Sequence, residues 1–194
     1  MITNIQIMSP IQELTNALSM FFAIAICWYY ICTQTSNLQT ICITIGTTLH
    51  FPASFAYHAY CSCSSDIYTA EVIKKIDISM IYISSIFYAF ATSKSIPYTI
   101  GCLLYTLFAI WYLVQQKGLG IHKMKRAASV GVCVILYTTP IVFLGNIVMY
   151  KYVIGSFASA STVYIIRPFG GWSHTVFHIL LAVFQYYILC ATNI

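Results

Sequence analysis

Charged residues are scarce in this sequence, and their scarcity excludes a water-soluble protein. Only 7% of the 194 residues are charged, whereas 60% are hydrophobic. Soluble domains carry about 25% charged residues, so this chain has too little polar surface to cover an apolar core in water. The surrounding solvent must therefore be lipid. The composition predicts an integral, multi-pass membrane protein, and residues 1–194 are expected to form a single domain.

Acidic residues are rarer than basic ones. The chain has four acidic and nine basic residues, which gives a net charge of +5. Most basic residues lie in short loops, and no polar segment interleaves them with aromatic residues as nucleic-acid binding would require. The positive charge therefore bears on membrane topology, and no nucleic-acid partner is expected. Most of the eight cysteines lie inside apolar runs, where a free thiol acts as a small apolar side chain.

Long apolar runs account for most of the chain. A helix needs roughly 20 apolar residues to cross the hydrocarbon core of a bilayer. The runs lie at about 11–33, 39–61, 76–93, 97–116, 127–149, 152–166 and 173–191. Only Tyr150 and Lys151 separate the fifth run from the sixth, and Pro140 predicts a kink in the fifth. The pattern predicts an all-α membrane protein built as a seven-helix transmembrane bundle.

The distribution of basic residues predicts the orientation of this bundle. Cytosolic loops of membrane proteins carry an excess of lysine and arginine. With a cytosolic N-terminus, seven basic residues fall in cytosolic loops and two in the opposite loops. The seven are Lys74, Lys75, Lys117, Lys123, Lys125, Arg126 and Arg167, and the two are Lys94 and Lys151. We therefore expect a cytosolic N-terminus and a lumenal or extracellular C-terminus.

This topology places rare polar residues at one membrane depth. On the cytosolic side, His58 ends the second run and Asp77 begins the third. The first run begins there with Glu13, and the seventh with His174. A charge in the middle of a bilayer costs about 3 kcal/mol even by the lowest scales. Polar residues from four helices are therefore expected to contact one another at the cytosolic end of the bundle.

Three histidines have the spacing of a metal site. His174 and His178 are four residues apart, so they share one helix face and can hold one ion. His58 would add a third nitrogen and leave a fourth position for water, as in catalytic zinc sites. Three imidazoles and a water suit zinc, whose bound water ionises near neutral pH and attacks carbonyl groups. The alternative is a pair of interfacial histidines that only hydrogen-bond to neighbours.

Two further residues are candidates for catalysis. Ser54 lies four residues before His58 on the same face, where it would either bond to a carbonyl of its own helix or stabilise a developing oxyanion. Asp77 would either accept a proton from zinc-bound water or form a salt bridge with Lys74 or Lys75. The apolar setting predicts a membrane lipid as the substrate or ligand.

Other polar residues are expected to support the site. Glu13, Asn16 and Ser19 recur every third residue along the first run, so they should face the bundle. Hydrogen bonding is expected of Asn16 and Ser19, and Glu13 is expected to reach the site. His50 lies eight residues before His58 and is interpreted as a packing or cavity residue rather than a ligand.

Taken in order, these motifs resemble a known family. They are Ser54-Phe-Ala-Tyr-His58, Asp77 in KKIDISMIY, Ser173-His174-Thr-Val-Phe-His178, and the early set of Glu13, Asn16 and Ser19. The ordered set resembles the progestin and adipoQ receptor family, which includes hemolysin III proteins, within a superfamily that also holds alkaline ceramidases. The resemblance runs from about residue 10 to about residue 190.

The resemblance implies both an architecture and an activity. It implies zinc held by His58, His174 and His178 on the cytosolic side, with Ser54 and Asp77 around the bound water. It also implies hydrolysis of an amide or ester bond in a membrane lipid, with a ceramide-like substrate. The alternatives are a lipid- or steroid-responsive receptor and a membrane-modulating hemolysin III-like protein, each with structural zinc. A pore ranks last, because the polar residues gather at one depth and form no continuous stripe.

Overall fold

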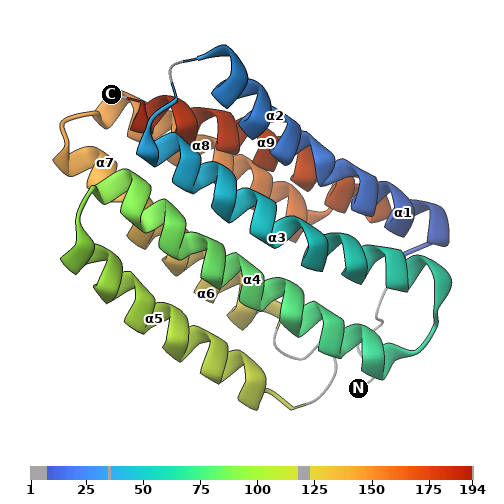
Figure 1. The fold of residues 1–194 in the computed structure, drawn as a ribbon. Helices are drawn as coiled ribbons and strands as arrows, with labels where there is room; N and C mark the ends of the chain where they lie inside the picture. The colour runs from blue at the N-terminus through green and yellow to red at the C-terminus, as the bar shows by residue number, and fades with distance from the viewer. Residues whose placement is uncertain (1–7, 35, 118–122, 194) are drawn as a thin grey trace.

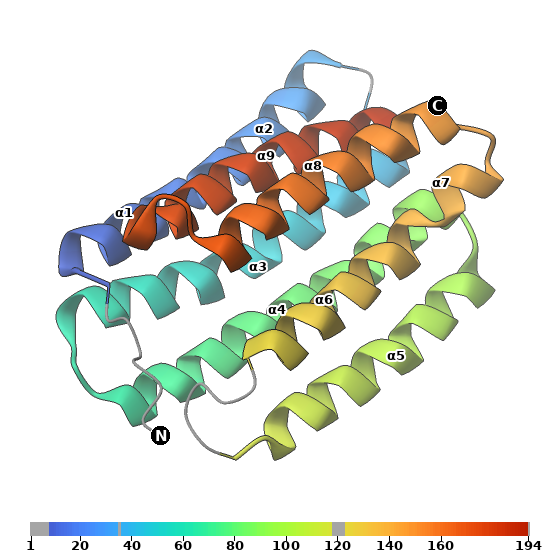
Figure 2. The same cartoon turned by 180° about the vertical axis from the view of Figure 1, so that it is seen from behind.

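The fold is a bundle of α-helices. The computed structural model describes residues 8–34, 36–117 and 123–193, and every regular element in these ranges is helical. The elements are α1 (Pro10–Ser19), α2 (Phe21–Thr33), α3 (Leu38–Cys63), α4 (Ile67–Ser93), α5 (Ile96–Gln115), α6 (Lys123–Thr138), α7 (Pro140–Phe143), α8 (Ile147–Ile166), the short 3₁₀ helix η1 (Gly170–Trp172) and α9 (Ser173–Thr192). The helices run side by side, with α5 at one edge and α2 at the other (Figures 1 and 2). The all-α expectation is confirmed.

Five helical segments within the described residues are long and apolar enough to cross a membrane. They are Pro10–Thr33, Ile67–Ser93, Ile96–Gln115, Met124–Phe143 and Gly170–Thr192. This length and composition indicate an integral, multi-pass membrane protein. Helices α3 and α8 belong to the same bundle but are not among the five segments, so the count of seven spans stays a prediction.

Helix α4 begins earlier than the apolar pattern indicates. It starts at Ile67, whereas the sequence places the third span from about residue 76. Asp66 precedes the helix, and its carboxylate accepts hydrogen bonds from the main-chain N–H groups of Tyr68 and Thr69. Such a cap satisfies donors that the first turn leaves unpaired. The helix therefore includes the polar stretch that the sequence assigns to the connection.

The expected kink at Pro140 is present. Helix α6 ends at Thr138, and the short helix α7 begins at Pro140. Proline has no N–H to donate and its ring collides with the preceding turn, so an interior proline kinks or breaks a helix, and here the helix is interrupted at residue 139.

The turn after α7 corrects the boundary between the fifth and sixth runs. Gly145 adopts a left-handed backbone with φ of 86°, which glycine tolerates without strain. Asn146 then caps α8, because its side-chain oxygen accepts from the N–H of Met149. The connection therefore lies at residues 144–146, and the expected separation at Tyr150 and Lys151 is wrong, because both residues lie inside α8.

Helices α3 and α4 pack closely at one glycine. The main-chain oxygen of Gly46 accepts a hydrogen bond of 2.7 Å from the hydroxyl of Ser84. A Cβ at position 46 would lie only 3.0 Å from the main-chain oxygen of Ser84. Small residues permit this approach, which is how helices gain packing energy in lipid. The contact sets how α3, which carries His58, lies against α4.

Replacing Gly46 by leucine is expected to destabilise the bundle, because the new side chain would collide with α4. Overpacking of this kind costs about 1–3 kcal/mol of unfolding free energy. Gly101 in α5 is the matched control, since a Cβ there has no atom of another residue within 4 Å. Thermal unfolding in detergent, followed by circular dichroism, should give a lower midpoint for Gly46→Leu than for Gly101→Leu. Equal midpoints would contradict the close contact.

Candidate metal centre

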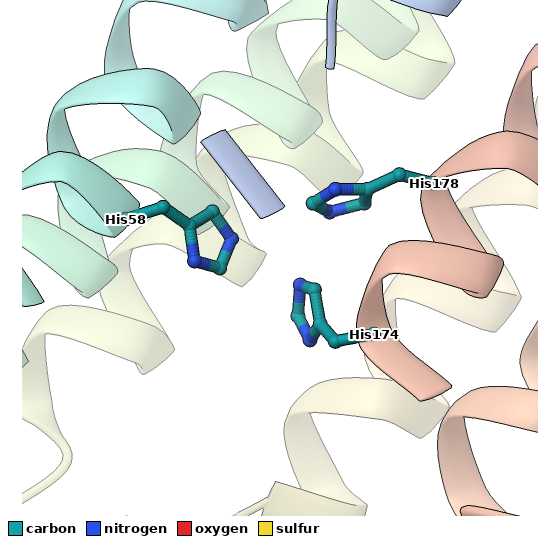
Figure 3. A group of neighbouring side chains, drawn as sticks. All are labelled: His58, His174 and His178. Carbon is teal, nitrogen blue, oxygen red and sulfur yellow. The ribbon is translucent and has the colours of Figure 1, made fainter. Parts of the chain in front are cut away.

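The three histidines identified in the sequence lie together in the structure. His58 comes from the last turns of α3, and His174 and His178 come from the first two turns of α9. One ligand nitrogen from each ring lies within 4.8 Å of the others. The ring centres are 4.8 Å apart for His58 and His174, and 4.5 Å apart for the two histidines of α9. Figure 3 shows the three rings facing a common centre.

The chain reversal before α9 places its first turn inside the bundle. Helix α8 ends at Ile166, and the next residue, Arg167, adopts a left-handed backbone with φ of 56°. The hydroxyl of Ser173 accepts a hydrogen bond of 2.9 Å from the main-chain N–H of Phe169 and so closes this turn. The spacing of four residues then projects His174 and His178 from the same face of α9.

Burial differs among the three rings. His58 is 1% exposed and His178 is 4% exposed, whereas His174 is half-buried. A buried imidazole requires partners for both ring nitrogens, because an unpaired polar group in an apolar interior costs free energy. The partners of His58 and His178 therefore decide which nitrogen faces the centre.

Glu13 fixes the ring of His58. Its Oε2 lies 2.7 Å from Nδ1 of His58, and the glutamate side chain is itself buried. A carboxylate accepts hydrogen bonds, so Nδ1 of His58 must carry the hydrogen. Nε2 is then the nitrogen with a lone pair, which is the form that binds metals.

Hydrogen counting gives the same result for His178. Its Nδ1 lies 2.8 Å from the hydroxyl of Ser19 and 3.1 Å from the main-chain oxygen of Asn16. The Ser19 hydroxyl donates its only hydrogen to that same oxygen, at 2.7 Å. Because the Asn16 oxygen can only accept, Nδ1 of His178 carries the hydrogen, which leaves the lone pair on Nε2.

Helix α1 thus supports the ring cluster as the sequence predicts. Glu13 contacts His58, whereas Asn16 and Ser19 contact His178, and the side-chain oxygen of Asn16 also accepts from Thr175 at 2.7 Å. Histidines that bind metals commonly donate their second ring N–H to a carboxylate or a carbonyl, which orients the ring. Two of the three rings have this arrangement.

Asp77 lies outside the three-histidine group. Its Oδ1 is 2.9 Å from Nε2 of His50, a contact that joins α4 to α3. The alternative of a salt bridge with Lys74 or Lys75 is wrong, because Lys75 donates to the main-chain oxygen of Gln116 and Lys74 lies over the ring of Tyr57.

His50 is the residue whose role the sequence interpretation missed. The sequence indicates a packing or cavity residue, and in the structure His50 hydrogen-bonds to the carboxylate of Asp77. The signal was its spacing, since His50, Ser54 and His58 recur every fourth residue and share one face of α3. Ser54 is buried between them on that face, at 2% exposure.

Comparison with known proteins identifies no family or function for this chain. No protein-family model matches the chain, and a search of curated proteins finds no match. The resemblance to the progestin and adipoQ receptor family therefore stays a prediction, and the arguments for function depend on the residues themselves.

Glu13→Ala removes the acceptor that orients His58, so it is expected to weaken binding of a divalent metal ion. Loss of such a supporting hydrogen bond costs about 10- to 100-fold in affinity. Glu13→Gln keeps an oxygen acceptor and should lose less. Dissociation constants for Zn²⁺, measured by competition with a chromophoric chelator, would separate the three proteins. Wild-type affinity in Glu13→Ala would show that this contact does not hold the ring for metal.

Proposed function

We propose that this protein is a seven-span membrane hydrolase that uses zinc to cleave an amide or ester bond of a ceramide-like membrane lipid. A relationship to the progestin and adipoQ receptor family is part of the proposal. The observation that carries it is the cluster of three imidazoles, two of which have Nδ1 hydrogen-bonded to oxygen. Both of these rings keep the Nε2 lone pair available for an ion.

The ligand set fits zinc better than other common ions. Neutral imidazoles suit zinc, copper, iron and nickel, whereas calcium and magnesium require oxygen ligands. Three histidines with an open fourth position form the arrangement of catalytic zinc sites. A bound zinc ion would supply an acidified water and polarise a substrate carbonyl. The chain's own residues would orient the rings, exclude bulk water and move the proton.

Asp77 and Ser54 are the residues proposed to act on the reacting groups. The carboxylate of Asp77 would accept the proton of the attacking water, and the hydroxyl of Ser54 would donate to the developing oxyanion. They come from α4 and α3, which the Gly46 contact holds together. Of the two, Ser54 is closer in sequence to a ligand, one turn before His58.

The depth of the site favours a lipid amide or ester as the substrate. His58 lies five residues before the end of α3, which corresponds to about 8 Å of helix. His174 is the second residue of α9. A site this close to the helix ends lies near the membrane interface, where the linkage between a lipid head group and its chains is found. The half-buried ring of His174 is the most open part of the cluster.

A receptor with structural zinc is the second candidate. Its support is the pairing of Asp77 with His50, which gives the carboxylate a structural partner away from the three rings. In that case the ion would only brace α3 against α9. The candidate includes a lipid- or steroid-responsive receptor and a hemolysin III-like membrane-modulating protein.

The proposed topology has seven spans and a cytosolic N-terminus. It adds α3 and α8 to the five apolar segments, and it places the three histidines on the cytosolic side. Its support is the excess of lysine and arginine at that end of the bundle, in α4, in α6 and in the connections beside them.

Two exposed cysteines test this topology. Cys63 lies at the end of α3, and Cys32 lies near the end of α2, so α3 separates them. With each as the single cysteine, a membrane-impermeant maleimide should label Cys63 from the cytosolic side and Cys32 from the opposite side. Labelling of both cysteines from one side would exclude α3 as a span.

Metal content and ceramide hydrolysis, measured on the same purified proteins, test the proposed activity. Wild type should hold about one zinc ion per chain and release fatty acid from ceramide. His178→Ala should lose both properties, because it removes a ligand. Asp77→Asn should keep the zinc and lose most of the activity. Asp66→Asn is the matched control and should keep both, since asparagine still caps α4.

Each contradictory result has a distinct meaning. Absence of metal from the wild type would overturn the zinc proposal. Zinc without hydrolysis of amide or ester lipids would favour the structural role of the ion. Full activity in Asp77→Asn would exclude Asp77 as the proton acceptor and leave the metal assignment intact.

A further inference from the structure

We propose that His50 is a positioning residue that holds the Asp77 carboxylate in the orientation needed beside the three-histidine cluster. The inference rests on the proposed hydrolase function, which uses Asp77 as the proton acceptor. His50 itself would touch neither the ion nor the substrate.

The contact between the two residues is direct and shielded from solvent. His50 Nε2 lies 2.9 Å from Asp77 Oδ1, and the two side chains are 20% and 13% exposed. Because a carboxylate accepts hydrogen bonds, Nε2 of His50 must donate. One carboxylate oxygen is thereby fixed, and the other oxygen keeps its capacity to accept a proton.

The pair lies on the face of α3 that leads to the metal cluster. His50, Ser54 and His58 are spaced four residues apart, so they form one stripe along the helix. The hydrogen bond brings Asp77 of α4 onto this stripe. Asp77 is therefore attached to the same helix face as the proposed oxyanion donor and the proposed ligand of α3.

The hydrogen bond from His50 keeps Asp77 from forming a salt bridge with Lys74. Lys74 lies three residues before Asp77 on α4. Oppositely charged residues at this spacing on a helix readily pair. Without His50, the carboxylate would be free to turn toward Lys74, whose ammonium group lies over the ring of Tyr57.

Two substitutions separate this role from simple packing. His50→Phe keeps a ring of similar size but removes the donor. His50→Gln removes the ring but places an amide N–H near the position of Nε2. If His50 only fills space, phenylalanine should be the better replacement. If it positions Asp77, glutamine should be.

The chain offers a direct spectroscopic readout, because it contains just two aspartates, Asp66 and Asp77. Carboxyl ¹³C NMR of protein labelled at the aspartate carboxyl carbon should therefore give two signals, which Asp66→Asn assigns. In His50→Phe we expect the Asp77 signal to move while the Asp66 signal stays. In His50→Gln the Asp77 signal should return toward its wild-type position. This readout requires neither metal nor substrate.

Kinetics provide the second readout. Loss of a supporting hydrogen bond at a metal site costs about 10- to 100-fold in activity, so kcat of ceramide hydrolysis should fall by about that factor in His50→Phe. KM and zinc content should stay at their wild-type values. His50→Gln should restore most of kcat.

The outcomes distinguish the inference from the proposed function. An Asp77 signal that does not move in His50→Phe, or a kcat that phenylalanine preserves and glutamine does not, would overturn the positioning role. Absence of zinc or of hydrolysis in the wild type would defeat the proposed function, while the NMR comparison would still decide whether His50 holds Asp77. If His50→Phe does not fold, His50→Leu replaces it, since leucine also lacks the donor.

Discussion

A polar side chain surrounded by lipid has no water to bind, so its partners must come from the protein. In this bundle that constraint joins helices that are distant in sequence. Glu13 of α1 hydrogen-bonds to the ring of His58 on α3, and Ser19 of α1 hydrogen-bonds to the ring of His178 on α9. The same contacts that satisfy buried polar groups also select the tautomers of two histidines. Folding and the orientation of the histidine rings are therefore one physical process at this end of the molecule.

The constraint also acts deeper in the bundle, where no histidine is involved. The Tyr88 hydroxyl lies 2.9 Å from Thr47 and 3.3 Å from the side-chain oxygen of Gln185, which links α4 to α3 and α9. Gly46 lies one residue from Thr47, and its lack of a side chain lets α4 approach. These contacts join α3, α4 and α9, so the position of His58 depends on residues several turns away.

The sequence was sufficient for features that depend on one helix at a time. The apolar runs predicted a helical membrane protein, and the spacing of His174 and His178 predicted a shared face. It was insufficient where the register between two helices decides the outcome. The pairing of His50 with Asp77 depends on how far α4 slides along α3, which the tight packing at Gly46 sets and no local pattern encodes. Helix ends fixed by single caps were also missed, because hydropathy does not detect a carboxylate that binds N–H groups.

The hydrogen bonds behind the rings have a consequence for how an ion would be chosen. Flexible ligands adapt to ions of many sizes, and their ordering reduces affinity. Here Glu13 and Ser19 orient two imidazoles without an ion, so the protein and not the ion sets the spacing of the nitrogens. A small tetrahedral cation would meet nitrogen ligands already in place, whereas a larger ion that prefers oxygen would find no suitable ligand among the three rings. Selectivity for the ion would then depend on how rigidly the bundle holds the three rings.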